Sequence, residues 1–142
     1  KFILLGRMKF EFLDHTADIK FRAYGKTLER AFSNSALAFR KTMVGKVRSK
    51  RKMNISIEGK DLESLMYNFL EELLFLIDTS GFIISKVGKI KIDAEKFKLD
   101  CEILGDRVSR YDFKTEIKAI TYQEMFVREE NGRWISQVVL DV

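Results

Sequence analysis

Two stretches of the chain repeat apolar residues every three or four positions, which is the spacing of an amphipathic helix. The first covers residues 28–43, with Thr27 as its candidate N-cap and Gly45 as a natural stop. The second begins after Asp61 and ends before Gly81, and its apolar positions are Leu62, Leu65, Met66, Phe69, Leu70, Leu73, Leu74 and Ile77. The spacing predicts two helices that bury these faces in the protein core.

Much of the remaining chain alternates apolar and polar residues, as a half-buried β-strand does. The strand-like segments are 9–13, 19–24, 53–58, 82–87, 89–92, 97–103, 117–122, 125–128 and 134–140. Gly88 and residues 105–107 are expected turns, and Asn131-Gly132 predicts a type I′ hairpin turn, because both residues tolerate a positive φ. The order predicts an α+β fold with two helices packed on a mixed or mostly antiparallel sheet, and residues 86–111 are a candidate small β insertion.

The length of 142 residues predicts one domain. Residues 1–8 are expected to be a lead-in or an extra strand, because residues 1–7 are too short for a signal peptide. No apolar run approaches the ~18–20 residues that span a bilayer, so we expect no membrane partner. A cytoplasmic protein is the resulting expectation.

A single cysteine and a single histidine exclude several kinds of site. Cys101 has no partner for an intramolecular disulfide and no second thiolate for a zinc site. His15 alone cannot supply a two-histidine metal site. The chain also lacks glycine-rich nucleotide loops and the Gly-x-Ser-x-Gly motif. Clusters of charge therefore remain as the candidates for function.

Positive charge gathers in one stretch of a chain whose net charge is +5. Between residues 40 and 52 there are seven basic residues and no acidic one, whereas 19 basic and 21 acidic residues lie elsewhere. The candidate contacts in this stretch are Lys46, Arg48, Lys50, Arg51 and Lys52. Such a patch could meet phosphate, RNA or an acidic protein surface, or it could be a solvated loop and strand edge.

Negative charge gathers at the last two residues of the sequence. Asp141 ends a predicted strand, and the α-carboxylate of Val142 follows it. These two groups repel unless a cation or a basic side chain lies near. If Asp18 joined them, three carboxylates would form an all-oxygen site suited to Ca²⁺ or Mg²⁺. The alternative is a solvated C-terminal aspartate.

Several segments, in this order along the chain, resemble the archease family. They are residues 15–19 (His-Thr-Ala-Asp-Ile), 24–25, 28–32, 61–65, 69–75, 118–122 and 134–142. Together they cover nearly the whole chain from about Lys9. Gln123 departs from the pattern, since the family often has a histidine after the tyrosine, so no role of that histidine is carried over.

The resemblance implies an accessory protein of the RtcB-type RNA ligase, which joins tRNA exon halves, rather than an enzyme. Such a protein helps the ligase become guanylylated and turn over repeatedly. The family's divalent cation maps onto Asp18, Asp141 and the Val142 carboxylate, with Ca²⁺ expected and Mg²⁺ or Mn²⁺ as alternatives. Asp14 and His15 are expected to support that site without binding the ion, and His15 to orient the Asp18 loop. Contact with tRNA is expected to be indirect or weak.

Two other functions remain open from the residues alone. A stand-alone RNA-binding module could use the basic patch of residues 40–52, and it would bind tRNA with a steep dependence on salt. A metal-dependent hydrolase could use the carboxylates, although no general base beyond them is evident.

Overall fold

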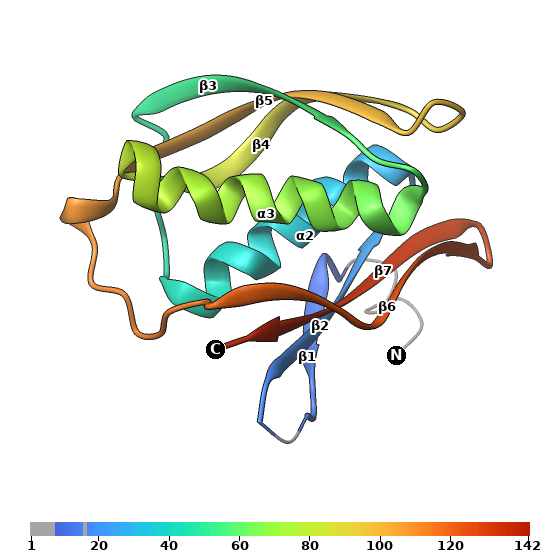
Figure 1. The fold of residues 1–142 in the computed structure, drawn as a ribbon, viewed down its shortest axis with the longest axis horizontal. Coiled ribbons are helices and arrows are strands. Elements are labelled where there is room, and N and C mark those ends of the chain that lie inside the picture. The colour runs from blue at the N-terminus through green and yellow to red at the C-terminus, as the bar shows by residue number, and fades with distance from the viewer. Residues whose placement is uncertain (1–7, 16) are drawn as a thin grey trace.

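The computed structural model describes residues 8–15 and 17–142 (Figure 1). Its elements are β1 (Phe10–Leu13), β2 (Ile19–Gly25), α2 (Leu28–Met43), β3 (Arg51–Glu58), α3 (Leu62–Ser80), β4 (Phe82–Asp93), β5 (Lys98–Arg107), η1 (Val108–Arg110), β6 (Ala119–Glu130) and β7 (Arg133–Asp141). The expected lead-in or extra strand lies outside the described residues except for Met8.

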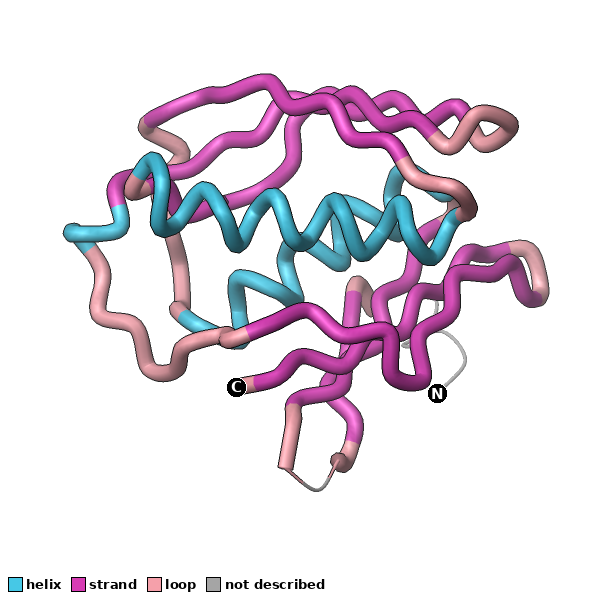
Figure 2. The backbone as a smooth tube through the Cα atoms, viewed as in Figure 1, coloured by secondary structure: helices cyan, strands magenta, loops and turns pink. Residues whose placement is uncertain are grey.

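The described strands form two antiparallel sheets instead of the single sheet expected. One sheet has the order β1-β2-β7-β6 and the other β3-β5-β4. Both helices lie between the sheets (Figures 1 and 2), where α2 contacts β2 and β4, and α3 contacts β6 and β4. The α+β class and the two helices are confirmed. The alternation of polar and apolar residues did not indicate which strands pair, so it could not separate two sheets from one.

Both helices begin and end where local signals predict. Thr27 accepts a hydrogen bond from the Arg30 N–H, and α2 covers the predicted residues 28–43. Asp61 and Ser64 form a capping box at the start of α3, while Gly81 ends that helix with a φ of 58° in the left-handed region. Neither described helix offers the long apolar stretch that crossing a bilayer would require.

The Asp61 cap leads to a test of helix stability. Hydrogen bonds from Ser64 hold the pKa of Asp61 below its usual value. Its contribution is therefore present above the pKa of the unfolded chain and is lost as pH falls through the folded-state pKa. We expect Asp61→Ala to cost about 1 kcal/mol near pH 7 and less near pH 3, by urea unfolding. Asp61→Asn keeps a capping side chain without a titrating group, so an equal loss in both variants near pH 7 would contradict this assignment.

One cluster of buried side chains joins the two sheets and the helices. Phe21 from β2, Phe39 from α2 and Phe69 from α3 are all fully buried in it. Residues 86–111, the candidate insertion, form the second part of β4, β5 and η1. Leu99 and Ile103 of this segment are buried in the same cluster, so the segment contributes to the core.

Two of the predicted turns are wrong, because both segments lie inside strands. Gly88 lies inside β4, where the register with β5 shifts between Val87 and Ile90, and a Cβ there would lie 2.6 Å from a carboxylate oxygen of Glu102. Gly105 lies inside β5, where a Cβ would lie 2.2 Å from the carbonyl oxygen of Ile83. Residues 105–107 therefore continue the strand.

The final hairpin follows the prediction, with one irregular segment. Asn131 and Gly132 have φ angles of 52° and 78°, as a type I′ turn requires. The two predicted strands before it form one strand, β6, whose pairing with β7 shifts between Thr121 and Phe126. Residues 122–125 therefore form an irregular segment within β6.

Candidate functional site

The pairing of β2 with β7 brings distant parts of the chain together. Ile19 pairs with Leu140 and Lys20 pairs with Val139 in an antiparallel register. Continuing this register by one residue sets Asp18 opposite Asp141. Two of the predicted cation ligands thus lie at the same end of neighbouring strands, and Val142 follows directly.

The end of β7 is held from both sides. Asp141 pairs with Ala119 of β6, and its carbonyl oxygen accepts a hydrogen bond of 2.7 Å from the Lys118 N–H. Val142 is half-buried and packs against the core cluster. Asp141 is therefore held in the sheet, and Val142 is held against the core directly after it.

Asp18 lines a cavity of about 440 Å³ beside this strand end. Phe12 and Ile19 contribute apolar surface to the cavity, and Lys41 and Lys114 contribute positive charge. The Asp18 side chain is half-buried, so it is partly withdrawn from bulk water. These two lysines can partly balance the charge of Asp18, which lines the same cavity.

The donors at this end suit a hard cation. Among the described residues, no group of three or more His, Cys, Asp or Glu side chains is arranged to hold a metal ion. The donor set expected from the sequence has two carboxylate side chains, from Asp18 and Asp141, and an α-carboxylate from Val142. All are oxygen donors, which Ca²⁺ and Mg²⁺ prefer. Burial, with the charge of Asp100, raises the pKa of the Cys101 thiol to about 12, so this buried group stays protonated and is no candidate ligand.

His15 contacts a residue that the sequence analysis did not select. Its Nε2 atom lies 3.1 Å from Oε2 of Glu124, and Lys20 Nζ lies 3.2 Å from Oε1 of the same carboxylate. Hydrogen bonds from His15 and Lys20 hold the pKa of Glu124 below its usual value. The loop before β2 is thereby tied to the irregular segment of β6. Asp14, the other supporting residue expected from the motif, is exposed.

Glu124 has an unusual backbone that its neighbours hold in place. Its φ is 54°, in the left-handed region that non-glycine residues seldom adopt. The Gln137 side-chain amide donates a hydrogen bond of 2.7 Å to the Glu124 carbonyl. The only sequence signal for Glu124 is the break between the predicted strands 117–122 and 125–128. Such a break does not indicate that Glu124 would contact His15.

The predicted basic patch is exposed, except at its first residue. Its members lie in the loop after α2 and on β3, an edge strand, and they are Lys46, Arg48, Lys50, Arg51 and Lys52. Arg40, by contrast, is half-buried and donates to the Ser85 carbonyl at 2.9 Å, and burial lowers the pKa of its guanidinium. Arg40 therefore supports the packing of α2 on β4 and does not belong to the exposed patch.

A cavity of about 490 Å³ adjoins the patch, and Arg110 adds a further cation to it. Its buried carboxylate, Asp106, accepts hydrogen bonds from the Tyr111 hydroxyl at 2.7 Å and the Arg107 N–H at 2.8 Å. The bond from Tyr111 lowers the pKa of Asp106. Tyr111 in turn accepts from the Arg48 N–H at 2.9 Å, which fixes the loop after α2.

Comparison with known proteins identifies the family. A sequence model of the Archease protein family matches residues 10–142. This chain belongs to the archease family. The match covers both strand ends that carry Asp18 and Asp141, as well as the basic patch.

Relatives of this archease chain cover almost its whole length. Protein archease of Pyrococcus furiosus is 42% identical over 141 residues, covering 94% of this chain and 99% of the relative. Protein archease of Aeropyrum pernix is 38% identical over 135 residues, with coverage of 91% and 94%.

Two solved structures share the fold of this archease chain. The solution structure of Methanobacterium thermoautotrophicum protein 1598 has a TM-score of 0.73 and 34% identity, covering 94% of this chain and 99% of that one. The crystal structure of an archease from Thermotoga maritima, described as a possible chaperone, has a TM-score of 0.63 and 18% identity, with coverage of 92% and 94%. The second likeness concerns the fold alone.

Proposed function

We propose that this archease chain is an accessory protein of an RtcB-type RNA ligase in tRNA splicing. In this role it binds a divalent cation, with Ca²⁺ preferred over Mg²⁺ or Mn²⁺, through Asp18, Asp141 and the α-carboxylate of Val142. It promotes guanylylation of the ligase and repeated turnover, while catalysis stays with the ligase. The observation that carries the proposal is the β2–β7 register, which aligns the first two of these residues.

A cation explains why acidic groups can share one strand end. The carboxylates repel one another, and a bound divalent ion offsets that repulsion because each carboxylate is attracted to the ion. Nucleotidyl transfer requires metal ions and phosphates held in line. An accessory protein that carries a metal ion can favour the reactive conformation of the ligase. It does so only if it binds that conformation more tightly than the resting conformation.

Ligation by the partner enzyme tests the proposal. Single- and multiple-turnover ligation of tRNA halves is measured with and without this protein, and we expect it to raise mainly the multiple-turnover yield. Asp18→Asn and Asp141→Asn are each expected to weaken Ca²⁺ binding by about tenfold or more, because each removes a unit charge next to the ion. Unchanged Ca²⁺ affinity and unchanged ligation in both variants would refute the proposal. Asp78→Asn, at an exposed aspartate of α3 that has no role in the site, serves as the matched control.

The exposed basic patch supports a second candidate, which is direct binding of RNA. It predicts tRNA affinity without the ligase that falls steeply with salt. Replacing Lys50 and Arg51 with Gln should then weaken binding of tRNA alone, whereas an effect confined to ligase association would contradict this candidate.

A further inference from the structure

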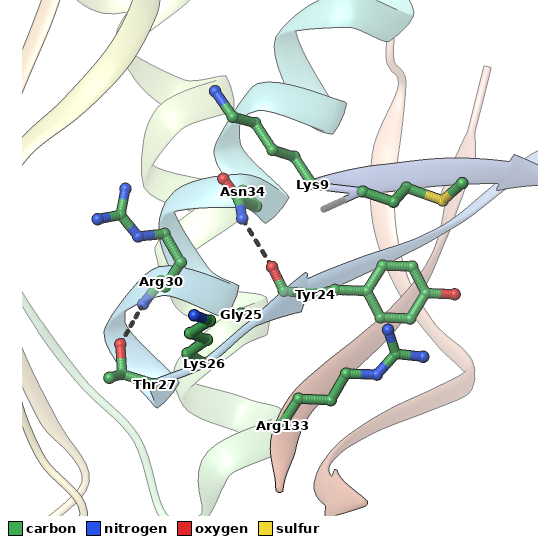
Figure 3. Close-up of a pocket in the computed structure, with 9 residues that line it drawn as sticks. Lys9, Tyr24, Gly25, Lys26, Thr27, Arg30, Asn34 and Arg133 are labelled. Carbon is green, nitrogen blue, oxygen red and sulfur yellow. Dashed lines mark hydrogen bonds between the residues drawn. The ribbon is translucent and has the colours of Figure 1, made fainter. Parts of the chain in front are cut away.

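A second charged cavity lies at the opposite end of the same two strands. It has a volume of about 400 Å³ and opens where β2 ends and α2 begins (Figure 3). Asp18 and Asp141 flank the other end of this strand pair, since β2 runs from Ile19 to Gly25 and β7 runs antiparallel to it. About seven residues of strand separate the two ends, or roughly 20 Å.

Packed backbone fixes the walls of this cavity. Gly25 lets the end of β2 run directly against α2, because a Cβ at that residue would lie 2.4 Å from the Ala31 nitrogen. The Asn34 side chain donates a hydrogen bond of 2.6 Å to the Tyr24 carbonyl, and the Tyr24 N–H donates to the Lys9 carbonyl at 2.9 Å. The cavity is therefore part of the folded frame.

The charge on the lining is of one sign. Lys9, Lys26, Arg30 and Arg133 line the cavity, and no acidic residue is among the described residues that line it. Within the described part of the chain, no carboxylate lies at salt-bridge distance from Lys9, Lys26 or Arg30. Figure 3 shows these basic side chains arranged around the end of β2 and the first turn of α2.

The neighbouring carboxylates have partners of their own. Glu29, in the first turn of α2, accepts a hydrogen bond of 3.3 Å from the Ile92 N–H. Glu11 accepts from the Tyr24 hydroxyl. The Arg133 guanidinium lies 4.4 Å from the centre of the Tyr24 ring, where it can be attracted to the ring face. The first turn of α2 adds the partial positive charge of a helix N-terminus to this surface.

We propose that this cavity is a binding site for adjacent phosphate groups. Its volume lies in the range of small-ligand sites and exceeds the needs of a single phosphate. Three exposed cations without acidic partners match a ligand that carries several negative charges close together. A nucleotide polyphosphate and an RNA backbone both present such groups. The site is separate from the carboxylate end and from the basic patch after α2.

Binding of inorganic pyrophosphate tests the site. Trp134, the only tryptophan, pairs with the lining residue Gly25 in the strand register, so its fluorescence is one readout to follow during the titration. The full chain is titrated with pyrophosphate at low salt and with EDTA, which removes any contribution from a bound metal, and calorimetry gives a second readout. We expect saturable binding that weakens as salt rises, because salt screens the charges.

A matched pair of double variants separates this site from general charge. Lys26→Gln with Arg30→Gln removes two cations from the lining, and we expect pyrophosphate affinity to fall at least tenfold. Lys89→Gln with Lys96→Gln removes two exposed cations outside the cavity, and we expect less than a twofold change. Circular dichroism checks that each variant is folded. No saturable binding by the wild-type chain, or an equal loss in both double variants, would overturn the proposal.

Competition identifies the source of the phosphates. If a 12-nucleotide single-stranded RNA displaces pyrophosphate from the wild-type chain, and the Lys26→Gln, Arg30→Gln variant binds that RNA more weakly, the site takes an RNA backbone. If ATP displaces it and the RNA does not, the site takes a nucleotide polyphosphate. If neither competes with bound pyrophosphate, the proposed ligand class is wrong.

Discussion

Adding two glycines after Val142 is expected to weaken Ca²⁺ binding by a hundredfold or more. The extension turns the α-carboxylate into a neutral amide and sets new backbone where the ion would lie. Two effects then act together, because a unit of charge is lost and the space is filled. Calorimetric titration with Ca²⁺ measures the affinity, and multiple-turnover ligation should lose its stimulation in parallel.

The matched control for this prediction lies at the same strand end. Val142→Ala keeps the α-carboxylate but removes most of a half-buried side chain that packs on the core. We expect it to lower stability slightly and to leave Ca²⁺ affinity within about twofold. If the extended chain bound Ca²⁺ as tightly as the wild type, the terminal carboxylate would not be a ligand.

Replacing Phe69 with alanine is expected to destabilise the protein by about 3–5 kcal/mol. Phe69 is fully buried on α3, and its ring centre lies 5.8 Å from that of Phe32 on α2, so the pair joins the helices between the sheets. The substitution leaves a cavity that the two sheets cannot readily close. Urea unfolding followed by circular dichroism gives the change in free energy.

Two comparisons make the Phe69 prediction specific. Phe69→Leu keeps most of the apolar volume and should cost clearly less than the alanine variant. Phe75→Ala, on the same helix, removes a ring that is 58% exposed and should change stability by less than about 1 kcal/mol. A loss of similar size at Phe69 and Phe75 would show that the helix, rather than the core, determines the effect.

The sequence predicts the helices well because their signals are local. The N-caps Thr27 and Asp61 and the terminating Gly81 lie within a few residues of the apolar pattern that they bound. The Asn131-Gly132 turn is local in the same sense, since both φ angles follow from the residues themselves. Such signals do not depend on the rest of the fold.

Features that arise from contacts between distant strands were not predictable in this way. Gly105 resembles a turn residue in sequence, but the close approach of Ile83 explains it. The link from His15 to Glu124 depends on the irregular segment of β6, which two short apolar patterns could not reveal. Asp18 and Asp141 were joined through family resemblance, and the β2–β7 register supplies their alignment.

The β2–β7 pairing also has a consequence for the kinetics of folding. It joins residues 19–25 to residues 134–141, so nearly the whole chain must be closed into a loop before this ladder can form. Such long-range pairing slows folding, and proline isomerisation adds no delay because the chain contains no proline. The acidic groups at residues 18 and 141 are aligned only once this ladder has formed. Uptake of Ca²⁺ during refolding would therefore show when residues 18 and 141 come together.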